Sequence, residues 1–488
     1  MAQHCGYVVE VKQLRPHANA DRLQIATFFG NDTCVGLDVK IGDVGIYFPA
    51  DLQLSAEFCE ENHMCRKRQD GTPDTGYLDP DKRNVKAIRL RGEKSDGIYC
   101  PLISLAYCFE SDKPDVGVMS FDIGDTIDVV NGHEICKKYI PRSNSYNYHK
   151  EGNHTRKKKV NIAPLFAEHA DTEQLAYNLE AFKPGDEIEI TLKMHGTSQR
   201  TGYLPVFKGY ADSWHCRLRN WIWFNFNRIT HKKDLYTTLD KFKHDGEPIY
   251  DWGYVSGTRR TVLENYNGGF YGSNEFREQH SKTFEGKLWK GETVYYEVVG
   301  FTDTGAPIMA DGNNEKVGKD FVKQYGKTTT FSYGCHPNGW NNKDGGYNSG
   351  HNEPQSDIYV YRMTMTNEDG DVVEYTPDFM RYRCEQMGVK YVPVFWHGFL
   401  GGNDCPYADE CTAKECNTGE CVKNKAEQYY DGPDPIGKTH IREGVVVRII
   451  NRPKFTAYKH KNYNFKIIEG LIKEVAETPD IEEAEDLI

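Results

Sequence analysis

The stretch ITLKMHGTSQR, residues 190–200, joins a strand-like run to a turn and has Lys193 at the junction. His195 and Gly196 follow directly, and two hydroxyl residues come next. The β-branched and apolar residues before Lys193 are typical of a strand. A lysine at a strand end is usually an ordinary solvated side chain. The alternative is a nucleophile, and the rest of the chain has to decide between the two.

Composition indicates a globular protein of two or three domains. The 488 residues exceed what one hydrophobic core holds, and 38% of them are apolar and 27% charged. No run approaches the ~18–20 apolar residues of a membrane helix, and the first residues lack the features of a signal peptide. The fourteen cysteines form no secreted-domain framework. We therefore expect a cytoplasmic protein without a membrane partner. We also expect the protein to be a monomer.

Charge is distributed unevenly along the chain. The formal net charge of −12 argues against a protein that coats nucleic acid in general. Residues 131–165 are predicted to form a linker with a basic run at 156–159. Such runs are more often solvated than bound, and a phosphate contact is the alternative. Residues 474–488 form an acidic tail with Glu474, Glu477, Asp480, Glu482, Glu483, Glu485 and Asp486.

Residues 1–130 predict a small β-rich domain. Runs such as YVVEV, RLQIATFF and VGIYF suit short strands, and Gly-Asp pairs at 42–43 and 124–125 suit the turns between them. About five short strands in this length are typical of a small barrel, including the OB type.

Residues 166–473 predict an α+β domain without a Rossmann or P-loop motif. We expect its polar insertion at 302–355 to be a long surface loop. A second insertion, at 401–425, is rich in cysteine. The strand-like runs of this domain are 251–257, 292–301, 357–366 and 442–450, and the helical ones are 171–182 and 376–388.

Four short motifs occur in a fixed order within this domain. Each alone is weak, since KHK is most often a solvated face and EGVVVR an ordinary buried strand. Together they resemble the covalent nucleotidyltransferase superfamily of ligases and capping enzymes. The motifs are KMHG at 193–196, YYEVVG at 295–300, EGVVVR at 443–448 and KHK at 459–461.

ATP-dependent RNA ligases are the most similar branch, because their first motif often reads K-x-H-G. Residues 16–30 and 85–102 resemble parts of the OB module of one such branch. An OB module before the catalytic domain resembles the Deinococcus/Naegleria-type RNA ligase family. The resemblance implies an N-terminal OB-type β-barrel, followed by a nucleotidyltransferase domain of antiparallel sheets with flanking helices.

The resemblance implies a role for each catalytic residue. Lys193 is expected to be the nucleophile that takes AMP from ATP, and Lys459 and Lys461 to lie at the α-phosphate. Glu443 is expected near a Mg²⁺ or Mn²⁺ ion, which carboxylates bind well. Glu297 is expected near the nucleoside sugar.

Further nucleotide contacts are implied by residues beside these motifs. His195 and Gly196 belong to the first motif. SGTRR at 256–260 resembles an arginine-bearing motif of the family, so Arg259 or Arg260 is expected to hold a sugar or phosphate. Tyr361 or Tyr359 of the run DIYVYRM is expected to contact adenine, and alternation along a strand does not choose between them.

The chain departs from the family pattern at two places. Ser198 stands where many members carry arginine, so Arg200, two residues further on, is the candidate contact. Leu192 stands where some RNA ligases carry a glutamate that reads the base. The preference for ATP over GTP therefore comes from the resemblance alone.

The chemistry of lysine agrees with the assignment of a nucleophile. An attacking amine must be neutral, and lowering a lysine pKa from ~10.4 to ~7.5 takes about 4 kcal/mol. Burial and nearby cations can supply this. Lys459 and Lys461 are two residues apart, so on a strand both point to one face. There they suit a triphosphate and also favour a neutral Lys193.

The cysteine-rich insertion is a possible zinc site. Its spacing is C-x5-C-x4-C-x4-C rather than paired CxxC, so free cysteines in a surface insertion are an equal alternative. The four candidate ligands are Cys405, Cys411, Cys416 and Cys421.

The sequence thus predicts an ATP-dependent RNA ligase. It would join 3′-hydroxyl and 5′-phosphate ends, as free RNA ends or in a nicked duplex, through lysine–AMP and RNA-adenylate intermediates. The alternatives are a DNA ligase, a GTP-dependent capping-type enzyme, or an inactive RNA-binding protein on the same scaffold.

Overall fold

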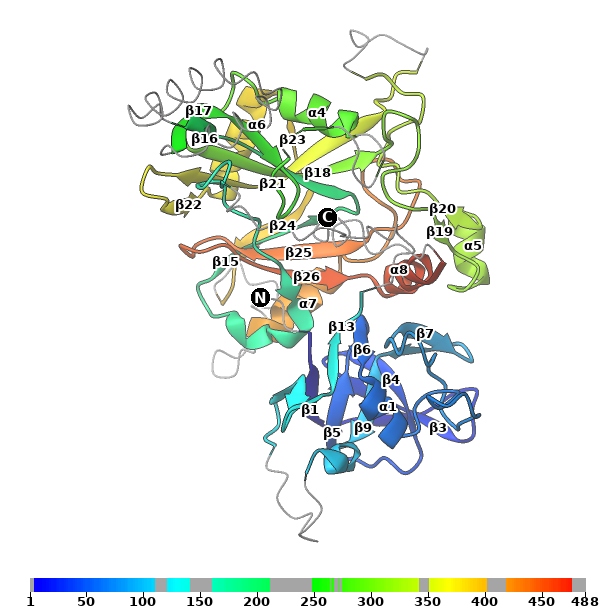
Figure 1. Cartoon of the computed structure of the whole chain (residues 1–488). Helices are drawn as coiled ribbons and strands as arrows, with labels where there is room; N and C mark the ends of the chain where they lie inside the picture. Colours follow the sequence, from blue (N-terminus) through cyan, green and yellow to red (C-terminus); the bar gives the residue numbers. More distant parts are fainter. Residues whose placement is uncertain are drawn as a thin grey trace, which may run out of the picture.

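The larger part of the molecule consists of two stacked, mainly antiparallel sheets, and a smaller N-terminal module lies beside them (Figure 1). No helix of the described residues is long and apolar enough to cross a membrane. The computed structural model describes residues 4–109, 121–140, 160–210, 248–263, 265–266, 271, 274–341, 351–401 and 418–475.

Short strands form the N-terminal module, as predicted. One sheet has the order β10-β1-β5-β9, and a second has the order β2-β3-β4. Alternate residues such as Ile46 and Phe48 are fully buried in the core of this module. The strand pairings of the described residues fall into five sheets and do not show a closed barrel, so the OB type stays a prediction. The elements are β1 (Gly6–Glu10), β2 (Leu14–Pro16), β3 (Leu23–Phe28), β4 (Asn31–Gly36), β5 (Val44–Phe48), β6 (Leu52–Leu54), α1 (Ala56–Glu61), β7 (Ala87–Leu90), β8 (Glu93–Asp96), β9 (Ile98–Pro101), β10 (Thr126–Ile127), β11 (Val129–Val130), β12 (His133–Glu134) and β13 (Cys136–Lys138), with a 3-10 helix at Leu102–Cys108.

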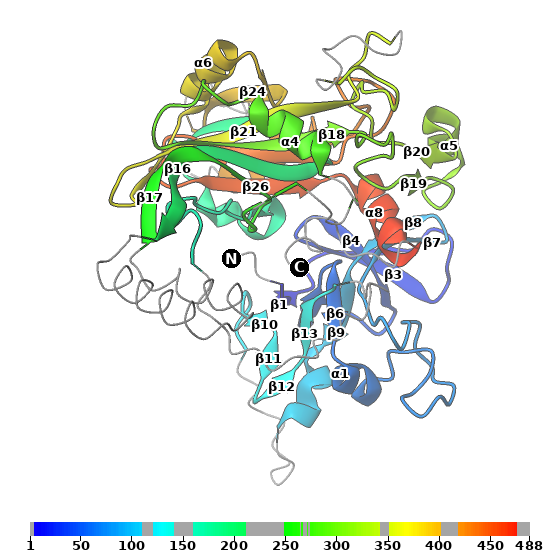
Figure 2. The same ribbon diagram turned by 45° about the horizontal axis from the view of Figure 1, so that its top comes forward.

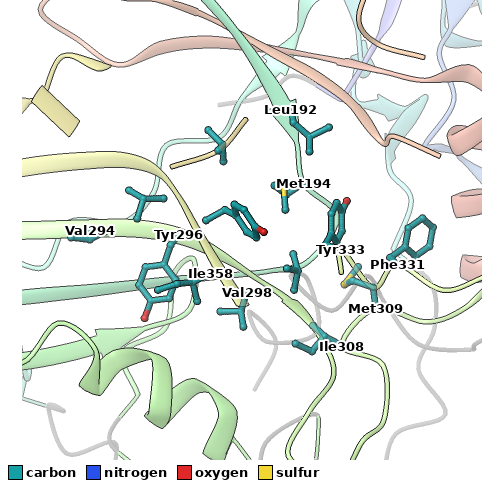
Figure 3. Packing of buried hydrophobic residues seen from close by; sticks show 14 of the residues in the cluster. Leu192, Met194, Val294, Tyr296, Val298, Ile308, Met309, Phe331, Tyr333 and Ile358 are labelled. Atoms are coloured by element: carbon teal, nitrogen blue, oxygen red, sulfur yellow. The ribbon is translucent and has the colours of Figure 1, made fainter. Parts of the chain in front are cut away.

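The larger module contains a five-stranded and a six-stranded sheet. The orders are β14-β26-β25-β15-β24 and β17-β16-β18-β21-β22, with β23 paired to β21. Apolar side chains of β18 and β21 meet Leu192 and Met194 in one core (Figure 3). The strands are β14 (Glu173–Gln174), β15 (Glu187–Lys193), β16 (Thr197–Tyr210), β17 (Pro248–Gly257), β18 (Glu292–Gly300), β21 (Ser356–Thr366), β22 (Val372–Glu374), β23 (Lys390–Tyr391), β24 (Val394–Phe399), β25 (Gly444–Ile449) and β26 (Thr456–Lys461).

Helices flank the sheets of the larger module. The helix predicted at 376–388 is α6, where the Thr376 side chain accepts from the amide of Phe379 and Gly388 ends the helix with a positive φ of 70°. The helices are α4 (Glu275–Lys282), α5 (Lys319–Tyr325), α6 (Pro377–Met387), α7 (Thr418–Glu427) and α8 (Tyr463–Val475).

The helix predicted at 171–182 is not formed. Glu173 and Gln174 form β14, which pairs with β26 and becomes the edge strand of the five-stranded sheet, and two 3-10 turns follow. Leu175 and Phe182 are buried against the five-stranded sheet. Pairing and burial against the sheet therefore override the helical pattern of this segment.

The polar insertion at 302–355 is not simply a surface loop. Its described part, up to residue 341 and from 351, contains α5 and the strand pair β19 (Gly312–Asn313) and β20 (Thr328–Thr329). Ile308, Phe331 and Tyr333 are buried in the core of the larger module. The apolar residues of this segment are widely spaced among polar ones, so the sequence pattern does not indicate that they pack in the core.

The start of α8 joins the two modules, and Figure 2 shows this helix beside β7 and β8. Lys466 donates to Asp96 at 2.6 Å, and the Tyr463 hydroxyl accepts from the amide of Ser95 at 3.1 Å. The ammonium of Lys94 lies 5.0 Å from the centroid of the Tyr463 ring. Because α8 follows β26 almost directly, this contact lies next to the KHK motif.

Candidate active site

One face of the five-stranded sheet carries the polar residues of the motifs. Side chains alternate along strands, so the apolar Ile190, Val445 and Val447 pack on one face against α7. Lys193, Lys459 and Lys461 line a cavity on the opposite face. Alternation puts Lys459 and Lys461 on this face, and the pairing of β15, β25 and β26 brings Lys193 beside them.

Lys193 and Lys461 converge on the same carboxylate. The Lys193 Nζ lies 2.8 Å from Glu443 Oε1, and the Lys461 Nζ lies 3.4 Å from the same atom. In the sheet register Gly444 pairs with both lysines, one on each side. A Cβ at this position would lie 2.1 Å from the carbonyl oxygen of His460, and φ is 149°, so glycine suits the close approach of the strands.

The Oε2 atom of Glu443 is available to bind a cation. Its side chain is 2% exposed, and its Oε2 makes no hydrogen bond within the described residues. The His195 Nδ1 lies 3.7 Å from this oxygen. A buried carboxylate oxygen without a hydrogen bond is unfavourable on its own, and a bound cation or ligand would satisfy it.

The turn after Lys193 is held at two successive amides. The His195 amide donates to the Tyr333 hydroxyl oxygen at 2.7 Å, and the Gly196 amide donates to Glu297 Oε1 at 3.1 Å. A Cβ on Gly196 would lie 2.4 Å from the carbonyl oxygen of Val298, so only glycine allows β18 to come this close.

The surroundings of Lys459 lower the pKa of its side chain. Burial, followed by the charges of Lys461, Lys193 and Arg259, lowers the pKa of Lys459 from 10.5 to about 8. Three cations therefore lie close enough to Lys459 to oppose its charge. A polyanionic ligand beside these cations would relieve the repulsion.

The cavity has a volume of about 680 Å³ and lies between the two modules. The larger module contributes the motif residues, together with His169 and Glu469. The N-terminal module contributes the opposite wall, which sequence reasoning did not anticipate. This wall includes His4, Tyr7, Phe29, Asp51, Lys138 and Tyr139.

Tyr361, rather than Tyr359, lies at the cavity. The pairing of β18 with β21 skips Tyr361, which is therefore the extra residue of a β-bulge. Tyr359 is buried in the core, whereas Tyr361 lines the cavity and its hydroxyl lies 2.8 Å from Ser198 Oγ. The bulge breaks the alternation that would put both rings on one face.

The candidate arginines Arg259 and Arg200 have different surroundings. Arg259 lines the cavity and pairs with Asp171 at 2.8 Å. Arg200 is 1% exposed, and its terminal nitrogens donate to the carbonyl oxygens of Phe166 and Arg260. Arg200 does not line the cavity, because both of its terminal nitrogens bind main-chain carbonyl oxygens, and its contact with the nucleotide stays a prediction.

Sequence reasoning also missed Glu469, which accepts from Lys461 at 2.7 Å. Glu469 lies in α8 and belongs to none of the four motifs, so no local pattern marks it. Glu469 is eight residues after Lys461, and it reaches Lys461 only because α8 folds back beside β26.

Comparison with known proteins bears on the fold. No family model matches the chain, and no curated protein matches it. The structure of a Naegleria gruberi RNA ligase mutant with AMP and Mn is similar at a TM-score of 0.50 and 14% identity, covering 95% of this chain and 98% of that one. The chain has the fold of that RNA ligase. The predicted resemblance is thus confirmed at the level of the fold.

Further structures of the same Naegleria gruberi enzyme align less closely. A mutant with ATP and Mn has a TM-score of 0.49 at 14% identity, covering 97% of this chain and 99% of that chain. The enzyme with PPi has a TM-score of 0.48 at 13% identity, with the same two coverages.

The zinc prediction lies mostly outside the described residues. Cys405, Cys411 and Cys416 fall there, and Cys421 lies in α7. Within the described part of the chain no three His, Cys, Asp or Glu side chains are grouped to hold a metal. The zinc site stays a prediction.

Proposed function

We propose that this protein is an ATP-dependent RNA ligase whose first step is the transfer of AMP to Lys193. The observation that carries the proposal is the position of the Lys193 amine, 2.8 Å from a buried Glu443 and in one cavity with Lys459 and Lys461. A volume of about 680 Å³ lies within the usual range for a nucleotide-sized ligand. The fold shared with the Naegleria gruberi enzyme supports the same reaction class.

The residues supply what lysine adenylation needs. The neutral Lys193 amine attacks the α-phosphorus, an N–P bond forms, and the P–O bond to pyrophosphate breaks. Glu443 Oε1 is placed to take the proton that the amine loses. Lys459 and Lys461 stabilise the negative charge that grows on the phosphate oxygens and on the leaving group.

A divalent metal fits the donor set. Glu443 Oε2 is buried without a hydrogen bond among the described residues, and a carboxylate oxygen is the ligand that Mg²⁺ and Mn²⁺ prefer. The lack of a larger carboxylate cluster in the described residues agrees with an ion held mainly by one side chain, phosphate oxygens and water. When bound, such an ion would withdraw charge from the phosphate oxygens.

Two later steps complete the proposed reaction. The AMP passes from Lys193 to the 5′-phosphate of an RNA strand, and a neighbouring 3′-hydroxyl then displaces it. The proposed partners are RNA ends or a nicked duplex, with the protein acting as a monomer. The cavity wall from the N-terminal module is the surface along which we expect the RNA to reach the adenylated lysine.

Covalent labelling with α-labelled ATP and Mn²⁺ tests the proposal. We expect the intact protein to gain one AMP, mapped by mass spectrometry to the peptide with Lys193. Lys193→Ala should remove the label without unfolding the protein, because the side chain is at a strand end and 23% exposed. Lys208→Ala, on the exposed part of β16, is the matched control and should be labelled normally.

Three outcomes would contradict the proposal. If Lys193→Ala is labelled as strongly as the unmodified protein, Lys193 is not the nucleophile. Label from GTP but not ATP would indicate capping-type chemistry. Sealing of nicked DNA in preference to RNA would indicate a DNA ligase.

A further inference from the structure

Residues 194–196 connect the two sheets of the larger module. Lys193 ends β15 in the five-stranded sheet, and Thr197 begins β16 in the six-stranded sheet. The main chain therefore leaves one layer and enters the other directly after the nucleophile. Any movement of this connection would displace the lysine amine.

The connection is held from the side by a segment outside the four motifs. The Tyr333 hydroxyl oxygen accepts from the His195 amide at 2.7 Å, and the ring of Phe331 meets the ring of His195 at 4.6 Å. Figure 3 shows Tyr333 and Phe331 in the same core as Met194. The segment 302–341 thus supplies part of the support of the active site.

The backbone at Tyr333 is in a conformation that tyrosine rarely adopts. Its φ is 49° and that of Gly334 is 79°, and the Cys335 amide bonds to the Ser332 carbonyl oxygen at 2.9 Å. Positive φ at both central residues is found in type I′ turns, where Asn, Asp and Gly are preferred. A bulky residue persists there only when its surroundings over-determine it, and such residues cluster at functional sites.

The side chain of Tyr333 is fully enclosed. It is 2% exposed, and its ring packs against that of His440 with centroids 4.5 Å apart and planes at 79°. Burial and the nearby charge of Glu443 raise the pKa of Tyr333 well above its usual value, so the hydroxyl stays protonated. It therefore acts as a fixed hydrogen-bonding group and not as an acid or base.

We propose that Tyr333 is a positioning residue for lysine adenylation, fixing the His195 amide so that the amine of Lys193 stays beside Glu443. The inference rests on the proposed function and deepens it. Glu297 fixes the next amide, that of Gly196, so two successive peptide groups after the nucleophile are held. A misplacement of a reacting group by about 1 Å can cost about a hundredfold in rate, so loss of this restraint is expected to slow the reaction measurably.

Tyr333→Phe in the full chain tests the proposal, because it removes the hydroxyl and keeps the ring. We expect lysine adenylation at saturating ATP to slow at least tenfold, with an unchanged KM for ATP. Sealing of a pre-adenylated RNA nick, which bypasses attack by the lysine, should change by less than twofold. A purely structural role would instead lower both reactions together.

Tyr359→Phe is the matched control. Tyr359 is buried in the same core, and its hydroxyl bonds to Asp357 rather than to the motif turn. This variant should adenylate like the unmodified protein. Adenylation by Tyr333→Phe within twofold of the unmodified rate, or an equal loss in both reactions, would overturn the proposal.

Hydrogen exchange separates this proposal from the proposed function. The peptide covering residues 190–200 should exchange one more amide quickly in Tyr333→Phe than in the unmodified protein. Unchanged exchange would refute the restraint whether or not the protein uses ATP. If the unmodified protein shows the restraint but forms no lysine–AMP, the proposed function fails and the assignment of Tyr333 to adenylation fails with it.

Discussion

Replacing Lys459 with methionine should stabilise the protein and at the same time weaken ATP binding. Lys459 is partly buried beside Lys461, Lys193 and Arg259, and these surroundings lower its pKa from 10.5 to about 8. Below pH 8 the folded protein therefore carries this charge at a cost that the unfolded chain does not have. Methionine has a similar length and lacks the charge.

The pKa shift gives the size of the effect. A change from 10.5 to about 8 corresponds to roughly 3 kcal/mol of unfolding free energy at pH 7. As the pH rises through 8 the folded protein releases the proton and the cost falls, to about 1 kcal/mol at pH 10. The stability gained by Lys459→Met should therefore shrink by most of its value between pH 7 and pH 10.

Urea unfolding at the two pH values measures this difference. Lys466→Met is the matched control, because Lys466 pairs with Asp96 at 2.6 Å and its loss should destabilise the protein. ATP affinity of Lys459→Met should fall about tenfold or more, since a charged contact to phosphate is lost. A Lys459→Met protein that is less stable than the unmodified chain at pH 7, or whose gain does not depend on pH, would refute the reasoning.

Two further predictions concern metals. Glu443→Gln should slow lysine adenylation about a hundredfold, and raised Mn²⁺ should restore part of the rate, because the amide is a weaker ligand than the carboxylate. Normal labelling by this variant would show that Glu443 does not bind the metal. Elemental analysis of protein from cells grown with added zinc should find one zinc ion per chain. A protein without zinc would refute the site predicted at Cys405, Cys411, Cys416 and Cys421.

The sequence by itself determined the strands that carry the motifs. The runs predicted at 292–301 and 442–450 correspond to β18 and β25, because alternation and β-branched residues act locally. The spacing of KHK was enough to put Lys459 and Lys461 on one face of a strand. The helix at 376–388 was also predictable from the sequence, since its Thr cap and its terminal glycine are local signals.

Only the tertiary structure decided which of these residues reach the cavity. A bulge turns Tyr361 toward the site and leaves Tyr359 in the core, and a bulge depends on how the neighbouring strand pairs. Main-chain carbonyl oxygens far along the chain bind the terminal nitrogens of Arg200, so its side chain does not line the cavity. Tyr333 and Glu469 enter the site from segments without any motif. Contacts between distant segments fix these positions, and no local pattern in the sequence encodes such contacts.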